Sequence, residues 1–131
     1  MQLDLTSKHA LVCGASEGIG RATAIELALL GADVTVLARR ENALREVIAQ
    51  LDSRGGQQHG LLIADMADRD GLRDAVGSLA QHKPIHILIN NTGGPPAGRA
   101  IDADLAAYLD AYGKHLLANQ TLAQAVVPGM R

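Results

Sequence analysis

The stretch LVCGASEGIG, residues Leu11–Gly20, decides how this chain folds. An apolar run ends at Cys13 and is followed by Gly14, Gly18 and Gly20. Glycines between a strand and a helix permit a tight turn, close approach of the backbone to a phosphate, and close packing of the helix on the sheet. The N-terminus of that helix offers N–H groups and a partial positive charge to an anion. The stretch therefore predicts a nucleotide-phosphate site, the alternative being a turn that binds nothing.

The rest of the chain alternates short apolar runs with segments of helical periodicity. Strands are expected at residues 9–13, 33–38, 59–65 and 85–89, and helices at residues 19–30, 41–54, 70–81 and 102–127. Strands that alternate with helices and are apolar on both faces indicate a parallel sheet covered on both sides. We therefore predict one α/β domain over residues 1–131, a doubly wound, Rossmann-like sheet of four strands. Right-handed crossovers favour the strand order 3-2-1-4.

The composition excludes several classes of protein. The net charge of −2 gives no sign of a nucleic-acid partner or an anionic membrane surface, and no apolar run is long enough to span a membrane. The single cysteine, Cys13, excludes an internal disulfide and fits a reducing compartment. The N-terminal residues lack the apolar core of a signal peptide. These observations together lead us to expect a cytoplasmic protein. Its core should be aliphatic, because the sequence contains no Phe and no Trp.

Four motifs, in order along the chain, carry a family resemblance. The glycines run G-x-x-x-G-x-G, and the later segments are LARR at residues 37–40, ADM at 64–66 and NNTG at 90–93. Together they resemble the short-chain dehydrogenase/reductase family, whose glycine motif is T-G-x-x-x-G-x-G and whose fourth strand is followed by N-N-A-G. Cys13 replaces the Thr of that motif, and Thr92 replaces the Ala. The segment NNTGGPPAG, residues 90–98, looks most like bacterial members similar to 3-oxoacyl-acyl-carrier-protein reductases.

The resemblance implies a nicotinamide cofactor, and the residues after the second strand favour NADP(H) over NAD(H). NAD-binding members carry Asp or Glu there, which accepts hydrogen bonds from the ribose. This chain instead has Ala38 followed by Arg39 and Arg40. A guanidinium can bind a 2′-phosphate with two hydrogen bonds, whereas a carboxylate repels it. Two observations leave the question open: arginines in a loop can simply be solvated, and some NADP-binding members have a basic residue where this chain has Glu17.

The resemblance also assigns the remaining cofactor contacts. The expected cofactor-binding residues are Gly14, Ser16, Gly18, Ile19, Gly20, Arg39, Arg40, Asp65, Met66, Asn90, Thr92 and Gly93. Asp65 would accept from the adenine amino group, with the backbone of Met66 beside it. The alternative for Asp65 is a helix cap. Asn90 would serve both the ribose and the backbone at the strand end.

His115 stands where the family has a catalytic Asn in its fifth helix. An imidazole can donate or accept a hydrogen bond there, and it can also titrate. The alternative is that His115 only packs. We expect no metal site, because no cluster of cysteines or carboxylates accompanies the histidines.

The family's catalytic Ser and Tyr-x-x-x-Lys have no match in this chain. The fourth residue after Tyr108 is Tyr112, and the fourth after Tyr112 is Leu116. The first interpretation is therefore the incomplete, cofactor-binding part of an oxidoreductase that acts on a small carbonyl or alcohol, with the 131-residue chain inactive by itself. The second is a natural short protein that binds a nucleotide or a partner without chemistry. The third, an unrelated nucleotide binder, should lack NNTG.

The open side of such a sheet predicts self-association. The fourth strand, IHILI, would have an unpaired edge without Pro or Lys. The last helix carries Leu105, Tyr108, Leu109, Tyr112 and Leu116 on one side. We therefore expect a homo-oligomer that pairs through this strand and helix, the alternative being a chain that is soluble only together with the missing half of the fold.

Overall fold

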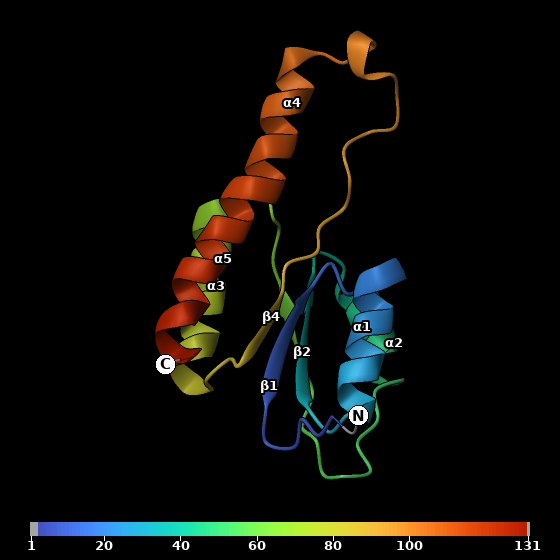
Figure 1. Cartoon of the computed structure of the whole chain (residues 1–131), viewed down its shortest axis with the longest axis vertical. Helices are drawn as coiled ribbons and strands as arrows, with labels where there is room; N and C mark the ends of the chain where they lie inside the picture. The colour runs from blue at the N-terminus through green and yellow to red at the C-terminus, as the bar shows by residue number, and fades with distance from the viewer. Residues whose placement is uncertain (1–2, 131) are drawn as a thin grey trace.

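The computed structural model describes residues 3–130 (Figure 1). Four parallel strands form one sheet in the order β3-β2-β1-β4. The strands are β1 (His9–Cys13), β2 (Asp33–Ala38), β3 (Gly60–Ile63) and β4 (Ile87–Ile89). The helices are α1 (Gly18–Leu29), α2 (Glu41–Ile48), α3 (Arg69–His82), α4 (Leu105–Tyr112) and α5 (Ala118–Val126). The predicted doubly wound fold and its strand order are confirmed.

Two aliphatic cores hold helices on opposite faces of the sheet. Helices α1 and α2 cover one face, and α3 and α5 cover the other (Figure 1). Val12 and Leu44 are buried in the first core, and Leu11 and Leu72 in the second. Each such side chain contributes about 1.5–3 kcal/mol when fully buried. Helix α1 buries only glycine and alanine, so its axis can lie close to the sheet and fix the turn after β1.

Helix α2 is shorter than the predicted segment 41–54. It ends at Ile48, because the N–H groups of Gln50 and Leu51 bond to carbonyls only three residues back. Such bonds tighten the last turn and stop the helix. Leu51 still packs in the core from the turn that follows. The apolar periodicity therefore continues past the end of the helix itself. Strands β3 and β4 are also shorter than the predicted 59–65 and 85–89.

The predicted helix 102–127 is a composite of several types. A 3-10 turn (Ala100–Asp102) precedes α4, a π-helical turn (Gly113–Leu117) joins α4 to α5, and a 3-10 turn (Val127–Met130) follows α5. Helix α5 buries Ala118, Leu122 and Val126 against α3. Helix α4 and the chain that leads to it extend beyond the sheet (Figure 1). Among the helices of residues 3–130, none has the length and apolarity needed to cross a membrane.

Candidate functional site

Parallel strands all end at one edge of the sheet, and the segments that follow them form the candidate site. In register, Cys13 of β1 lies beside Leu37 of β2, and Val12 lies beside Ile89 of β4. The segments at this edge are the glycine turn after β1, Arg39 and Arg40 after β2, Asp65 and Met66 after β3, and residues 90–93 after β4. All of the predicted cofactor-binding residues therefore follow strand ends at the same edge.

Backbone conformation and close packing both constrain the glycine turn after β1. Gly14 has φ +58°, a conformation that residues with a side chain rarely adopt. A Cβ on Gly14 would also lie 2.6 Å from the carbonyl oxygen of Asn91. A Cβ on Gly20 would lie 2.3 Å from the carbonyl oxygen of Gly14. These contacts bring the first turn of α1 directly onto the end of β1.

Asn91 fixes this turn from the end of β4. Its Nδ2 donates to the carbonyl oxygens of Cys13 and Gly14, at 3.3 Å each. The neighbouring Asn90 has an exposed side chain. Sequence reasoning selected Asn90 and missed Asn91, although the pair of asparagines at a parallel strand end was the available signal. The backbone part of the role expected of Asn90 thus belongs to Asn91.

The space over the glycine turn is open. Nothing lies within 4 Å of the position that a Cβ on Gly18 would take. Glu17 makes no side-chain cap to α1, and the first turn of that helix contains no acidic residue. The Ile19 side chain is 77% exposed, while Ser16 is half-buried. Uncapped N–H groups, open space and an exposed apolar side chain suit the approach of an anionic ligand with an apolar part.

The two arginines after β2 have different surroundings. Arg40 precedes α2, and its Nη2 lies 3.8 Å from a carboxylate oxygen of Glu17. Both of these side chains are largely exposed, so the pair contributes little to stability. Arg39 is exposed, and among residues 3–130 no carboxylate lies within 4.0 Å of its guanidinium. Arg39 is therefore the more available of the two for an anionic ligand. Arg21, on α1, donates to the side-chain oxygen of Gln50.

Asp65 and Met66 occupy the turn after β3. Asp65 is exposed, and its Oδ1 accepts from the N–H of Ala67 at 2.9 Å. The cap of α3 is Asp68, which accepts from the N–H of Gly71 at 3.0 Å. Asp65 therefore shapes the turn without capping the helix, and its exposed carboxylate is accessible to solvent or a ligand. Met66 packs against the core on the α3 side.

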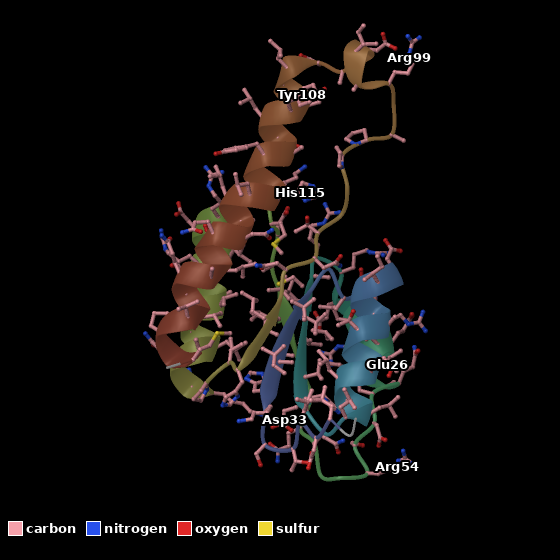
Figure 2. All side chains as sticks on the ribbon, in the orientation of Figure 1. Glu26, Asp33, Arg54, Arg99, Tyr108 and His115 are labelled. Carbon is pink, nitrogen blue, oxygen red and sulfur yellow. The ribbon has the colours of Figure 1, made fainter. Side chains whose placement is uncertain are left out.

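Thr92 and His115 meet at the far side of the site. The Thr92 hydroxyl and His115 Nδ1 form a hydrogen bond between the chain that leaves β4 and the π-helical turn. Figure 2 shows His115 on the side of the helix that faces this part of the chain. Gly93 follows with open space around it. The structure thus brings the predicted His115 to the same edge as Asn90, Thr92 and Gly93.

Cys13 lies under the turn and is fully buried. Burial raises the pKa of its thiol to about 12, so the reactive thiolate is not formed near neutral pH. Its role is packing at the end of β1. Within residues 3–130, no three His, Cys, Asp or Glu side chains are grouped so that they could hold a metal ion.

Comparison with known sequences identifies the family of this site. The sequence pattern of the short chain dehydrogenases matches residues 8–131. The chain belongs to the short chain dehydrogenase family. It is 33% identical, over 132 aligned positions, to a short chain dehydrogenase of Pseudocercospora fijiensis, covering 98% of this chain and 42% of that protein. It is 32% identical over 84 residues to a very-long-chain 3-oxoacyl-CoA reductase of Anas platyrhynchos, covering 64% of this chain and 27% of the other.

Solved structures of the family share this fold. The L-sorbose reductase of Gluconobacter frateurii, in complex with NADPH and L-sorbose, is 28% identical with a TM-score of 0.88. A 2-keto-3-deoxy-D-gluconate dehydrogenase of Streptococcus agalactiae is also 28% identical, with a TM-score of 0.79. The matches cover 99% and 98% of this chain but 50% and 48% of those chains. The chain therefore spans about half the length of these family members.

Proposed function

We propose that the protein carrying this chain is an NADP(H)-dependent oxidoreductase, which transfers a hydride between the nicotinamide cofactor and a carbonyl or alcohol substrate. The observation that supports this most directly is the glycine turn with Arg39 beside it at the carboxyl edge of the sheet. Two observations support NADP(H) over NAD(H) as the cofactor. The chain has no carboxylate at the end of β2, and the similar L-sorbose reductase was solved in complex with NADPH.

Different residues of the site would bind different parts of the cofactor. The open space over Gly18 and the N-terminus of α1 would bind the pyrophosphate, with Gly14, Gly20 and Ser16 shaping the turn. Arg39 would bind the 2′-phosphate with Arg40 beside it, and Asp65 with Met66 would hold the adenine. Asn90, Thr92 and Gly93 would line the path toward the nicotinamide, whose hydride the bound cofactor supplies. The residues of this chain would bind and orient that cofactor.

Arg39 is the residue proposed to select NADP(H). A hydrogen bond to a charged group contributes about 1.5–3 kcal/mol, which corresponds to roughly ten- to hundredfold in affinity. The whole protein should therefore bind NADPH more tightly than NADH, and Arg39→Asp should abolish or reverse that preference. Arg54→Asp changes the net charge equally at the opposite end of the sheet and should leave the preference intact (Figure 2). Equal affinity of the unmodified protein for both cofactors would contradict the assignment.

The 131-residue chain by itself is proposed to bind the cofactor without catalysing the reaction. It contains no Tyr-x-x-x-Lys to deliver a proton to a carbonyl, so it should bind cofactor without reducing substrate. His115 is the one residue here proposed to act at the reacting end. A substrate similar to a 3-oxoacyl thioester is the narrower proposal, supported by the segment NNTGGPPAG at residues 90–98 and by the likeness to the 3-oxoacyl-CoA reductase. We also propose that the protein is a homo-oligomer, supported by the exposed apolar face of α4. A cytoplasmic location is proposed because the single Cys13 fits a reducing compartment.

A further inference from the structure

Two residues that depart from the family pattern contact each other in this structure. Thr92 stands where the resemblance predicts Ala, and His115 stands where it predicts Asn. They are 23 residues apart in sequence, yet the Thr92 hydroxyl and His115 Nδ1 are hydrogen-bonded. Ala cannot make this bond, because it has no side-chain polar atom. The contact therefore depends on the departure at position 92, and it joins the two departures directly.

The backbone around His115 is unusual as well. His115 is the central residue of the π-helical turn Gly113–Leu117, between α4 and α5. Such turns are rare and occur frequently at functional sites, because the wider turn reorients the side chains that follow. Thr92 lies in the segment directly after β4, at the edge where the glycine turn also lies. The pair therefore joins the last helix to the carboxyl edge of the sheet.

We propose that Thr92 is a positioning residue for His115: its hydroxyl donates to Nδ1 and thereby keeps the proton of the neutral imidazole on Nε2. A neutral imidazole has one donor nitrogen and one acceptor nitrogen, and the partner of one decides the state of the other. Within residues 3–130, the Thr92 hydroxyl has no second acceptor at hydrogen-bond distance. Donation to Nδ1 therefore satisfies the hydroxyl proton and the nitrogen lone pair at once.

The consequence is a fixed N–H donor at the edge of the site. Nε2 of His115 has no partner among residues 3–130, and the side chain is only half-buried. An Asn amide at this position would also offer an N–H donor. Through this bond, Thr92 keeps an N–H donor on Nε2 of His115, in place of the N–H donor that an Asn side chain would offer at this position. This consequence for the reaction rests on the proposed oxidoreductase function, whereas the tautomer does not.

The tautomer can be measured by ring-¹⁵N NMR of histidine in the whole protein, at about pH 8.5, where an unperturbed imidazole is neutral. His115→Asn identifies the His115 signals by their loss. The unmodified protein and Thr92→Ser, which keeps the hydroxyl, should show protonated Nε2 and unprotonated Nδ1. Thr92→Val keeps the shape without the hydroxyl and should lower the ratio of Nε2–H to Nδ1–H forms about fivefold, the effect of one hydrogen bond. Thr92→Ala provides a second variant, should Val disturb the fold.

A proton on Nδ1 in the unmodified protein, or an unchanged ratio in both Thr92→Val and Thr92→Ala, would overturn the proposal. A kinetic measurement on the same variants tests the positioning role. The kcat of NADPH-dependent carbonyl reduction should fall in Thr92→Val and be restored in Thr92→Ser. A shifted tautomer with unchanged kcat would contradict that role. Absence of any reduction by the unmodified protein would instead contradict the proposed function, and the NMR result would still decide the tautomer.

Discussion

The molecule has a body and an arm that use similar sequence patterns in opposite ways. The body is the sheet with α1, α2, α3 and α5, and the arm is residues 93–112, which include α4. In α3, Leu72 and Val76 are spaced four apart and are buried against the sheet side. In α4, Leu105 and Leu109 have the same spacing but are 78% and 73% exposed. No residue of the arm is buried.

Apolar periodicity therefore predicts a helix but does not predict which surface, if any, covers its apolar face. Helix α3 has a sheet and α5 beside it, so its leucines are desolvated within the chain. The arm extends past the sheet, and its apolar face has no partner among residues 3–130 (Figure 1). An open groove of about 400 Å³ between the loop residues Pro95 and Pro96 and the helix residues Ala107 and Tyr108 adds to this exposed area. We therefore expect the arm to drive association, and the body to hold the cofactor.

The largest effect is expected from charging the apolar face of the arm. The double substitution Leu105→Glu with Leu109→Glu should convert a self-associated chain to a monomer, raising the dissociation constant about a hundredfold or more. The reason is that each leucine contributes about 1.5–3 kcal/mol when buried. Sedimentation of the 131-residue chain measures this. Leu29→Glu, at a 51% exposed position on α1 of the body, is the matched control and should leave the association intact. A wild-type chain that sediments as a monomer would contradict the expectation that the arm drives association.

A smaller effect is expected in the body, where α1 touches the glycine turn. Gly20→Ala places a Cβ 2.3 Å from the carbonyl oxygen of Gly14, and neither backbone segment can move without disturbing β1. The free energy of unfolding should fall by about 1–3 kcal/mol, as for other overpacked sites. Gly77→Ala, within α3 and with nothing within 4 Å, should instead raise it by about 1 kcal/mol through helix propensity. Urea unfolding of both variants tests the pair; equal stability of Gly20→Ala and the wild type would show that the turn is not closely packed.

The smallest effect concerns the opposite edge of the body. His9 is buried, its Nδ1 donates to the carbonyl oxygen of Pro84 at 3.1 Å, and its Nε2 accepts from the Thr35 hydroxyl at 2.7 Å. The pKa of His9 is lowered, mainly because burial disfavours the charged imidazolium. The positive charge of Lys83 lowers this pKa further, whereas the hydrogen bond to the Pro84 carbonyl and the negative charge of Asp33 partly oppose the shift.

Because the folded state favours neutral His9, its contribution to stability is complete above the ordinary histidine pKa. It is lost as the pH falls through the lowered pKa of the folded state. The free energy of unfolding should therefore decrease from pH 8 toward about pH 5, and His9→Asn should reduce that decrease. His82→Asn, at an exposed position on α3, serves as the control. A pH dependence identical in His9→Asn and the wild type would assign the acid sensitivity elsewhere.

Much of the body could be predicted from the sequence because its signals are local. The glycine turn, the β-branched strand Asp33–Ala38 and the apolar strand His9–Cys13 have the predicted positions. The end of α2 could not be predicted, since Leu51 continues the apolar pattern into a turn. The π-helical turn was equally hidden, because its residues are ordinary helix formers except for Gly113.

The sequence predicts where the residues of the candidate site lie, but it does not predict the contacts between them. Glycines and arginines after strand ends are recognisable by themselves. The tie from Asn91 to the Gly14 carbonyl and the bond from Thr92 to His115 join residues 77 and 23 positions apart. No local pattern encodes such pairs, because they depend on how β4 and the last helix are placed in the fold.

The most direct test of the account is a calorimetric titration of the 131-residue chain with adenosine 2′,5′-bisphosphate and with adenosine 5′-monophosphate. Both probes carry only the part of the cofactor assigned to residues of the body. The chain should bind the bisphosphate with one-to-one stoichiometry and roughly tenfold or more tightly than the monophosphate, because of one charged hydrogen bond to Arg39. Arg39→Asp should remove the difference. Equal affinities for the two probes, or no binding of either, would contradict the claim that this glycine turn and arginine form an NADP(H) site.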